Sequence, residues 1–165
     1  GTDRVRWFHE PVDALAAPTH LPGLRTMFNA FHHFEESDKQ KLIAGAAKHG
    51  LFVAEVLQPD VWCFLKIAFT TTVGQVLLAP LVRPFRWERL LFTWILPVNV
   101  LTVTWDGLAS VLKVDAPRRM FERARLYAPE GCTTFSGMSG YVWAPVAWFC
   151  VLPAEVVNTG DQPLI

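Results

Sequence analysis

Two apolar runs constrain the fold of this chain more than any other feature. Residues 67–82 (IAFTTTVGQVLLAPLV) and 90–105 (LLFTWILPVNVLTVTW) contain no charged side chain, and Pro80 and Pro97 interrupt them. Each run is shorter than the roughly 20 residues that a straight transmembrane helix needs, and proline breaks the hydrogen bonding of a helix. The runs therefore predict an apolar helical hairpin within residues 60–113, which either caps a sheet or lies at a membrane surface.

The connection between the two runs, RPFRWER, is the strongest candidate for a contact surface. Arginines beside aromatic side chains are typical of segments that lie at a membrane interface, where guanidinium groups meet phosphate headgroups. Alternatively, these arginines could contact acidic side chains of a partner protein, or they could lie in solvent at the ends of two helices. The predicted membrane or partner contacts are Arg83, Phe85, Arg86, Trp87 and Arg89.

The composition supports a surface that meets lipid or protein. The chain is 52% hydrophobic with seven Trp and twelve Phe, and only 18% of its residues are charged, against about 25% in an ordinary soluble domain. Its 165 residues predict a single domain, 1–165. The formal charge of the chain is zero, without the excess of basic residues that nucleic-acid binding proteins have. Nucleic acid is therefore excluded as a partner.

A strand-helix-strand unit precedes the apolar runs. Leu24–Phe31 is predicted as a buried strand, Ser37 as the N-cap of a helix, and Gly50 as the residue that ends it. A second strand, residues 51–57 (LFVAEVL), follows at once. Short connections of this kind predict a parallel pair with a right-handed crossover, and Val5–His9 is a shorter strand before it.

The region after the hairpin predicts one helix and one strong strand. Asp115 is expected to cap a helix that has Pro117 in its first turn. The Gly-rich stretch 132–140 (CTTFSGMSG) is predicted as a loop with at most a short edge strand, and residues 141–152 (YVWAPVAWFCVL) as the last strand. Residues 154–165 are predicted as a loose tail.

Several stretches resemble the class I S-adenosylmethionine-dependent methyltransferases. They are EPVDALAAPTHLPGLRTMFNAFHHF, LFVAEVL, RPFRWERLLFTWILP and WDGLASVLK, which together cover nearly the whole chain. The resemblance implies an α/β fold built on part of a Rossmann-like sheet, whose strand order in that family is 3-2-1-4-5-7-6. This chain aligns from the third strand onward, so it is expected to supply strands three to seven with the apolar hairpin inserted.

The resemblance also implies where ligands would lie. Asp13 falls in the loop after strand three, NAFHHF follows strand four, and Glu55 ends strand five, at the edge where open α/β sheets bind ligands. The vestigial cofactor-binding candidates are Asp13, Asn29 and Phe31. Glu55 and Asp13 could instead cap loops or lie on the surface, and Asp106 is interpreted as a helix or turn cap.

The donor-binding half of such a fold is missing from the sequence. No Gly-rich GxGxG turn precedes Asp13, and the chain starts with Gly1. We therefore expect a truncated or processed product in which strand four has an unpaired edge. No cofactor is expected, unless a partner chain supplies the missing half and S-adenosylmethionine with it.

The adjacent His32 and His33 are the candidate catalytic residues. On a strand or turn they are expected to point to opposite sides, which disfavours a shared metal ion, and no metal site is predicted. One imidazole could act as a base or orient a substrate. Alternatively, one ring packs under the following helix while the other lines a vestigial cleft. The free cysteines Cys63, Cys132 and Cys150 have no metal or disulfide spacing and are interpreted as small buried residues.

Two functions are consistent with these observations. The favoured one is a non-catalytic accessory subunit, derived from a methyltransferase fold and built with other protein subunits into a membrane-associated assembly. An organellar energy-transducing complex of the mitochondrial inner membrane is one candidate host. The alternative is an enzyme: the carboxyl-terminal half of a split methyltransferase that acts on a lipid-like or quinone-like acceptor under the hairpin.

Overall fold

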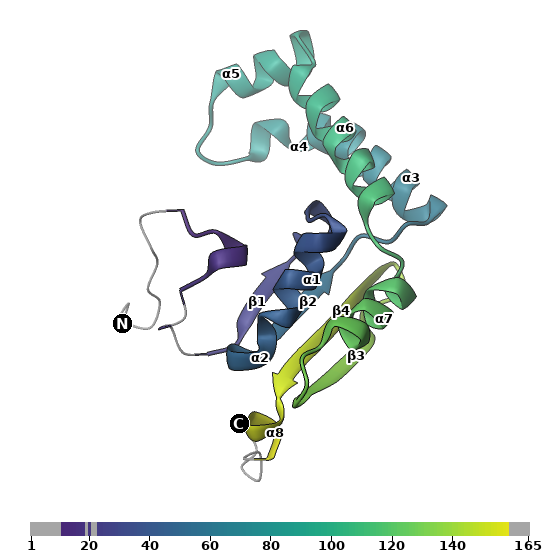
Figure 1. Cartoon of the computed structure of the whole chain (residues 1–165). Helices are drawn as coiled ribbons and strands as arrows, with labels where there is room; N and C mark the ends of the chain where they lie inside the picture. Colours follow the sequence, from purple (N-terminus) through teal and green to yellow (C-terminus); the bar gives the residue numbers. More distant parts are fainter. Residues whose placement is uncertain (1–10, 19, 21–22, 159–165) are drawn as a thin grey trace.

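The computed structural model describes residues 11–18, 20 and 23–158. A four-stranded mixed sheet and helices on one of its faces form the lower part of the molecule, and a pair of long helices projects from it (Figure 1). The predicted strand Val5–His9 lies outside the described residues. The α/β class is confirmed.

The predicted strand-helix-strand unit is confirmed, but its strands are shorter, and the first is half-exposed rather than buried, with Phe28 64% exposed. Strand β1 (Arg25–Phe28) leads through the 3-10 turn η2 (Phe31–His33) to helices α1 (Glu36–Ala44) and α2 (Ala46–His49) and then to β2 (Leu51–Glu55). The two strands are parallel. Gly50 has a φ of 72°, a left-handed value that favours glycine at the end of a helix.

The predicted cap at Ser37 is wrong. Helix α1 begins at Glu36, with Glu35 in extended conformation at the N-cap position. The turn η2 ends only at His33 and leaves the chain extended at Phe34, so the helix starts before Ser37 and places that residue inside its first turn.

The sheet order is β1-β2-β4-β3, with β3 (Cys132–Tyr141) and β4 (Ala144–Pro153) forming a long antiparallel hairpin. The prediction of a loop at residues 132–140 is therefore wrong. Its glycines are needed for packing, because a Cβ on Gly137 would lie 3.0 Å from the indole of Trp148 on the neighbouring strand.

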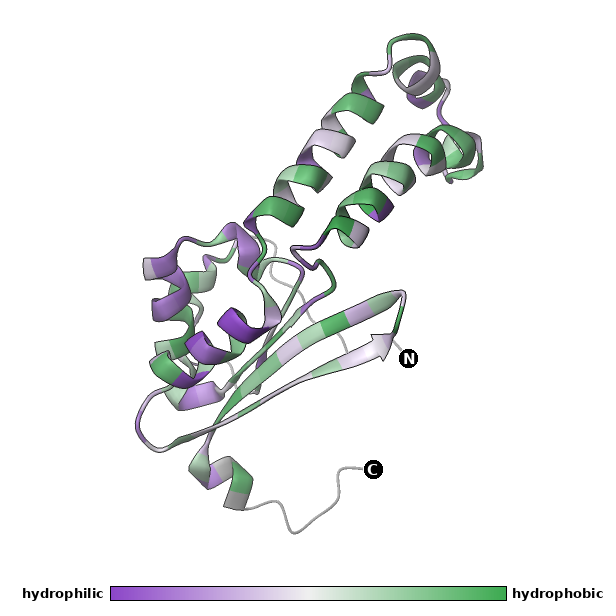
Figure 2. Cartoon of the chain, turned by 90° about the vertical axis from the view of Figure 1, so that its right-hand side faces the viewer, coloured by the Kyte–Doolittle hydropathy of each residue, from purple (hydrophilic) through white to green (hydrophobic). Residues whose placement is uncertain are grey.

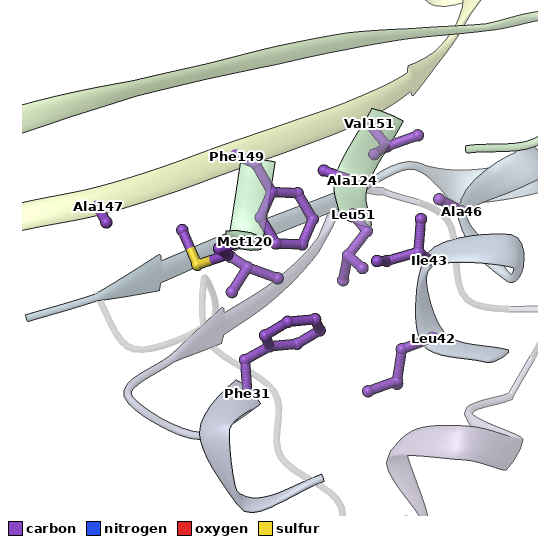
Figure 3. Packing of buried hydrophobic residues seen from close by; sticks show 11 residues of the cluster. Phe31, Leu42, Ile43, Ala46, Leu51, Met120, Ala124, Ala147, Phe149 and Val151 are labelled. Atoms are coloured by element: carbon purple, nitrogen blue, oxygen red, sulfur yellow. The ribbon is translucent and has the colours of Figure 1, made fainter. Parts of the chain in front are cut away.

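The hydrophobic core lies between the sheet and the helices α1, α2 and α7 (Pro117–Tyr127). Alternate residues of β4 point into it: Ala147, Phe149 and Val151 are buried, whereas Trp148 and Cys150 between them face the other side of the sheet. Figure 3 shows Phe149 and Phe31 meeting edge to face in this core, with ring centroids 5.4 Å apart. Helix α7 begins at Pro117 as predicted, although Ala116 rather than Asp115 is its N-cap residue.

The apolar insertion is a helical hairpin. Its first leg runs through α3 (Val61–Phe69), the π-helical turn η3 (Thr70–Gly74), α4 (Gln75–Leu78) and the 3-10 turn η4 (Ala79–Leu81). The chain returns through α5 (Trp87–Leu90), the π-helical turn η5 (Leu91–Ile95) and α6 (Val98–Lys113). Figure 2 shows that apolar residues cover most of both legs.

By length and composition, Val61–Leu81 is one helix able to cross a membrane, and Trp87–Ile95 with Val98–Lys113 forms a second candidate that is bent by 74°. The interpretation of Asp106 as a cap is wrong, since it lies inside α6. Its neighbour Gly107 permits the close approach of the two legs, because a Cβ there would meet Ile67 at 2.7 Å.

The first and last described segments are short helices. The 3-10 turn η1 (Ala14–Ala16) precedes β1, and α8 (Ala154–Asn158) follows β4. The tail predicted at residues 154–165 is therefore helical over its first part, and residues 159–165 lie outside the described part of the chain.

Candidate functional site

Asn29 joins the carboxyl ends of the two parallel strands. Its backbone N–H donates to the carbonyl of Ala54 at 2.9 Å, and its Oδ1 accepts from the backbone N–H of Val56 at 2.7 Å. The residue has a φ of 49°, in the left-handed region that asparagine tolerates better than most residues. The side chain therefore fixes the turn that follows β1, and its carbonyl oxygen is already engaged.

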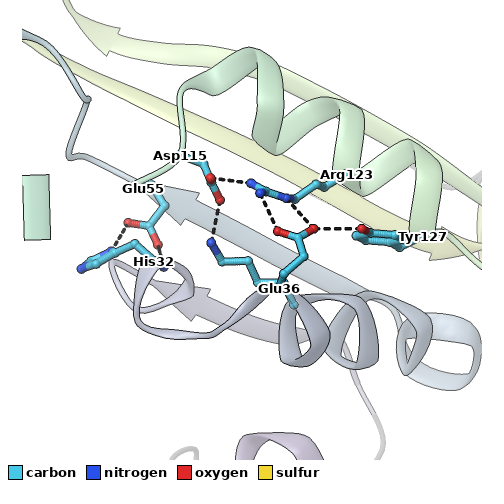
Figure 4. Close-up of polar contacts among 7 residues, drawn as sticks. His32, Glu36, Glu55, Asp115, Arg123 and Tyr127 are labelled. Carbon is cyan, nitrogen blue, oxygen red and sulfur yellow. Dashed lines mark hydrogen bonds and ion pairs between the residues drawn. The ribbon is translucent and has the colours of Figure 1, made fainter. Parts of the chain in front are cut away.

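His32 is buried and paired with Glu55. The His32 Nδ1 lies 2.9 Å from Glu55 Oε2, and the His32 backbone N–H donates to Glu55 Oε1 at 3.2 Å. Only 2% of Glu55 is exposed. Of the two structural alternatives for Glu55, the surface position is wrong and the loop cap is confirmed, because the carboxylate accepts from the His32 backbone N–H and holds η2 against the end of β2 (Figure 4).

His33 is exposed and stacks on His32. The ring centroids are 4.2 Å apart, with 37° between the planes. The expectation that the two rings point to opposite sides is wrong, because a 3-10 turn separates neighbouring side chains by about 120° rather than the 180° of a strand. His32 is the buried imidazole of the pair, and His33 is the exposed one.

The other two cofactor candidates do not line a common site with Asn29. Phe31 is 1% exposed and belongs to the core, where the Lys39 ammonium lies 5.4 Å from its ring centroid. Asp13 is exposed and accepts a hydrogen bond from the Leu15 backbone N–H in η1. Phe31 is therefore a packing residue, and Asp13 caps a turn.

The face of the sheet opposite the helices carries an apolar hollow that sequence reasoning missed. Phe28, Phe52 and Trp148 form a row of neighbouring rings, with centroids 6.0 and 6.2 Å apart. They line an open hollow of about 540 Å³ together with Asn29 and Val146. The nearly uninterrupted apolar runs of β2 and β4 could have indicated this second apolar face.

A network of charges ties α1 and α7 to the end of the hairpin (Figure 4). Asp115, which directly follows the hairpin, accepts from Lys39 at 2.7 Å and pairs with Arg123. Arg123 also donates to Glu36 at 2.8 Å, as does the Tyr127 hydroxyl. No sequence pattern indicated this network, because its members are far apart along the chain.

The network shifts the pKa values of its acids downward. Burial raises the pKa of Asp115, but hydrogen bonds from Lys39 and Arg123 outweigh burial and bring it below its ordinary value. The hydrogen bond from Arg123 lowers the pKa of Glu36, and the hydrogen bond to Glu36 raises the pKa of Tyr127. Both carboxylates are therefore ionised and paired at neutral pH, which is a structural role.

The arginine-aromatic segment lies at the far end of the hairpin from the sheet. Phe85 and Trp87 are 60% and 63% exposed, and Arg83 and Arg86 are also exposed. Arg89 is turned inward, with its guanidinium donating to the carbonyls of Val82 at 2.7 Å and Pro84 at 3.3 Å. Arg83 and Arg86 are thus the two guanidinium groups presented outward.

Among the residues that the structure describes, no group of three His, Cys, Asp or Glu side chains is placed to hold a metal ion. S-adenosylmethionine does not fit them alone either, because Asn29 Oδ1 is engaged, Phe31 is buried and Asp13 caps its own turn.

Comparisons with protein-family models, with curated proteins and with solved structures find no match to this chain.

Proposed function

We propose that this chain is the acceptor-side part of an S-adenosylmethionine-dependent methyltransferase that acts on a lipid-like or quinone-like acceptor. The observation that carries the proposal is the sheet order β1-β2-β4-β3. In this proposal the four strands correspond to strands four, five, seven and six of the methyltransferase order 3-2-1-4-5-7-6. Asn29 and the two imidazoles then follow strand four, where an open α/β sheet binds its ligands.

The proposal requires a further polypeptide segment, because the described residues do not form a donor site. Two surfaces are suited to receive it. Among the described strands, β1 pairs with β2 alone, so its other edge can accept a strand. The row of Phe28, Phe52 and Trp148 leaves the second face of the sheet apolar, whereas parallel strands are normally covered on both faces.

The residues of this chain divide between positioning and proton transfer. Glu55 holds His32, and His32 supports the stacked ring of His33. His33, whose imidazole is exposed, is the group that would take a proton from the acceptor. S-adenosylmethionine would supply the methyl group if the further segment held it.

An apolar acceptor is favoured by the position of the hairpin. The hairpin leaves the sheet just after β2, and the chain returns from it just before α7. The base of the hairpin therefore lies at the same sheet edge as Asn29. Most large apolar side chains along its legs are exposed, among them Leu77, Leu101 and Trp105. An acceptor dissolved in lipid would reach the carboxyl edge of the sheet along this surface.

A second candidate is the non-catalytic accessory subunit. The internal engagement of Asn29 and the burial of Phe31 favour it, since neither residue is free to hold a donor. In that case the apolar hairpin and the β1 edge are contacts with other subunits, and no methyl transfer takes place.

The two functions differ in methyl transfer by the protein as isolated from its source membrane in mild detergent. We expect label from methyl-labelled S-adenosylmethionine to appear in an organic-soluble product. His33→Asn should lower the rate by about 100-fold or more, the usual contribution of a general base. Ser37→Ala, an exposed change nearby in α1, should leave the rate unchanged. A preparation that neither binds the labelled donor nor transfers its methyl group would refute the enzyme and support the accessory subunit.

A further inference from the structure

The charged side chains of the helical hairpin lie at two levels, one at its far end and one near its base. No charged side chain lies between these two levels. At its far end are Arg83 and Arg86, and near its base are Lys66 and Asp106. Gly107 packs against Ile67, so Asp106 and Lys66 lie at a similar height on the two legs. Residues 67–82, between the two levels, form a charge-free layer about 24 Å thick at 1.5 Å per residue.

Aromatic side chains accompany the charges at both levels. Phe85, Trp87 and Trp94 are exposed at the far end. At the base, Trp62 is 69% exposed, and the turn between β3 and β4 presents Tyr141 and Trp143 with their rings stacked at 4.8 Å. Lys66 Nζ donates to the Trp143 carbonyl at 3.0 Å and so joins this turn to the hairpin. Aromatic rings in two belts are typical of membrane proteins.

Four threonine hydroxyls within the layer form hydrogen bonds on their own helix, whereas Gln75 Oε1 and Thr104 Oγ1 are buried there without a partner. The hydroxyls of Thr70, Thr71 and Thr72 donate to backbone carbonyls three or four residues earlier, and that of Thr102 does the same in α6. In hydrocarbon, where water cannot serve as a partner, hydroxyl groups require such internal hydrogen bonds.

We propose that the hairpin crosses a lipid bilayer, with Arg83 and Arg86 at the headgroups of the far leaflet and Trp62, Tyr141 and Trp143 at those of the near leaflet. The first leg, Val61–Leu81, has 21 residues and is about 31 Å long, close to the roughly 30 Å of the hydrocarbon core. The thinner charge-free layer is accommodated by long Lys and Arg side chains that reach toward the headgroups and by local thinning of the bilayer.

The second leg is not straight. Helix α6 is inclined by 74° to Trp87–Ile95, so the two parts of this leg do not share one direction through the bilayer. Insertion into a single leaflet would leave Arg83 and Arg86 near the bilayer centre, where a charged side chain is strongly disfavoured. A hairpin lying flat would expose apolar side chains to water, because both legs are apolar on most sides.

This inference goes beyond the proposed function, since crossing a bilayer involves no methyl transfer, and either can fail while the other stands. The test adds the purified full chain to closed vesicles of phosphatidylcholine and phosphatidylglycerol and labels it with a membrane-impermeant maleimide. Glu88→Cys places a thiol in α5 at the far end, and Gln40→Cys places one on the exposed side of α1. The free native cysteines give the background.

We expect Gln40→Cys to be labelled at once and Glu88→Cys to be labelled only after detergent opens the vesicles. Equal labelling of both thiols in closed vesicles would overturn the proposal, because the far end would then lie on the outer surface. Failure of the unsubstituted chain to float with the vesicles in a density gradient would overturn it as well, independently of any effect of the substitutions.

Discussion

The sheet with its helices and the helical hairpin are stabilised in opposite ways. The first buries a core in which Phe149, Val53 and Val151 are 0% exposed, and it pairs its buried charges. The hairpin leaves most of its large apolar side chains exposed, with Trp105 at 76% and Leu112 at 78%. Large apolar side chains are therefore buried within the first region, whereas in the hairpin they remain available for contact with lipid or protein.

The largest expected effect is a difference in the free energy of unfolding when one large side chain is truncated to alanine in each region. Phe149→Ala should lower the free energy of unfolding by about 3–5 kcal/mol, because it leaves a cavity in the core. Trp105→Ala should change it by less than about 0.5 kcal/mol in detergent, because an exposed ring loses few protein contacts. Denaturant titration in the same detergent measures both. A larger loss for Trp105→Ala would mean that the hairpin is packed against protein.

The buried pair under the hairpin base tests whether paired polar groups stabilise the sheet region. Glu55→Ala leaves His32 buried without its partner and should cost about 1–3 kcal/mol. Glu122→Ala, which removes an exposed ion pair with Arg118, should cost no more than about 0.5 kcal/mol. Thermal unfolding followed by circular dichroism compares them. Equal effects would show that the His32–Glu55 contact does not stabilise η2.

The outward arginines should matter for membranes and not for folding. Arg86→Gln should weaken binding to anionic vesicles about fivefold, corresponding to about 1 kcal/mol per basic side chain near the surface. Arg118→Gln removes an exposed arginine from α7 and should leave binding unchanged. Co-sedimentation at low and high salt measures both. If the two variants behave alike, general charge rather than the far end of the hairpin controls attachment.

The smallest expected effect is a loss of folding stability at acidic pH. The pKa values of Glu36 and Asp115 lie below their ordinary values of 4.5 and 3.8 in the folded chain. As the pH falls below 4.5, the unfolded chain binds more protons than the folded one. The contribution of these two carboxylates to stability should therefore be fully present above pH 4.5 and be lost as the pH falls through the folded pKa values. Unfolding free energies measured in a pH series should show a shallower fall for Asp115→Asn, and an unchanged slope would contradict the network.

Local patterns predicted the elements whose neighbours lie close in sequence. Pro117, Gly50 and the apolar runs indicated the start of α7, the end of α2 and the hairpin. Strand β3 was missed because its glycines make sense only once Trp148 lies across Gly137. Asp106 was misread because an Asp-Gly pair usually marks a turn, whereas here Gly107 serves contact between helices.

The candidate site was predicted in position more than in detail. The motif FNAFHHF does follow the first described strand, but the engagement of Asn29 with Val56 depends on a φ that no pattern specifies. The pairing of His32 with Glu55 joins residues 23 positions apart. The 3-10 turn determines that His32 rather than His33 is buried. Residue types alone do not distinguish such a turn from the end of a strand.

The open side of β1 has a consequence for the chain before it is assembled. A row of unsatisfied backbone donors and acceptors beside exposed Phe28 is a template onto which a second copy could add a strand. Because no other described strand pairs with this side, isolated molecules at high concentration are expected to associate through it even with the core intact.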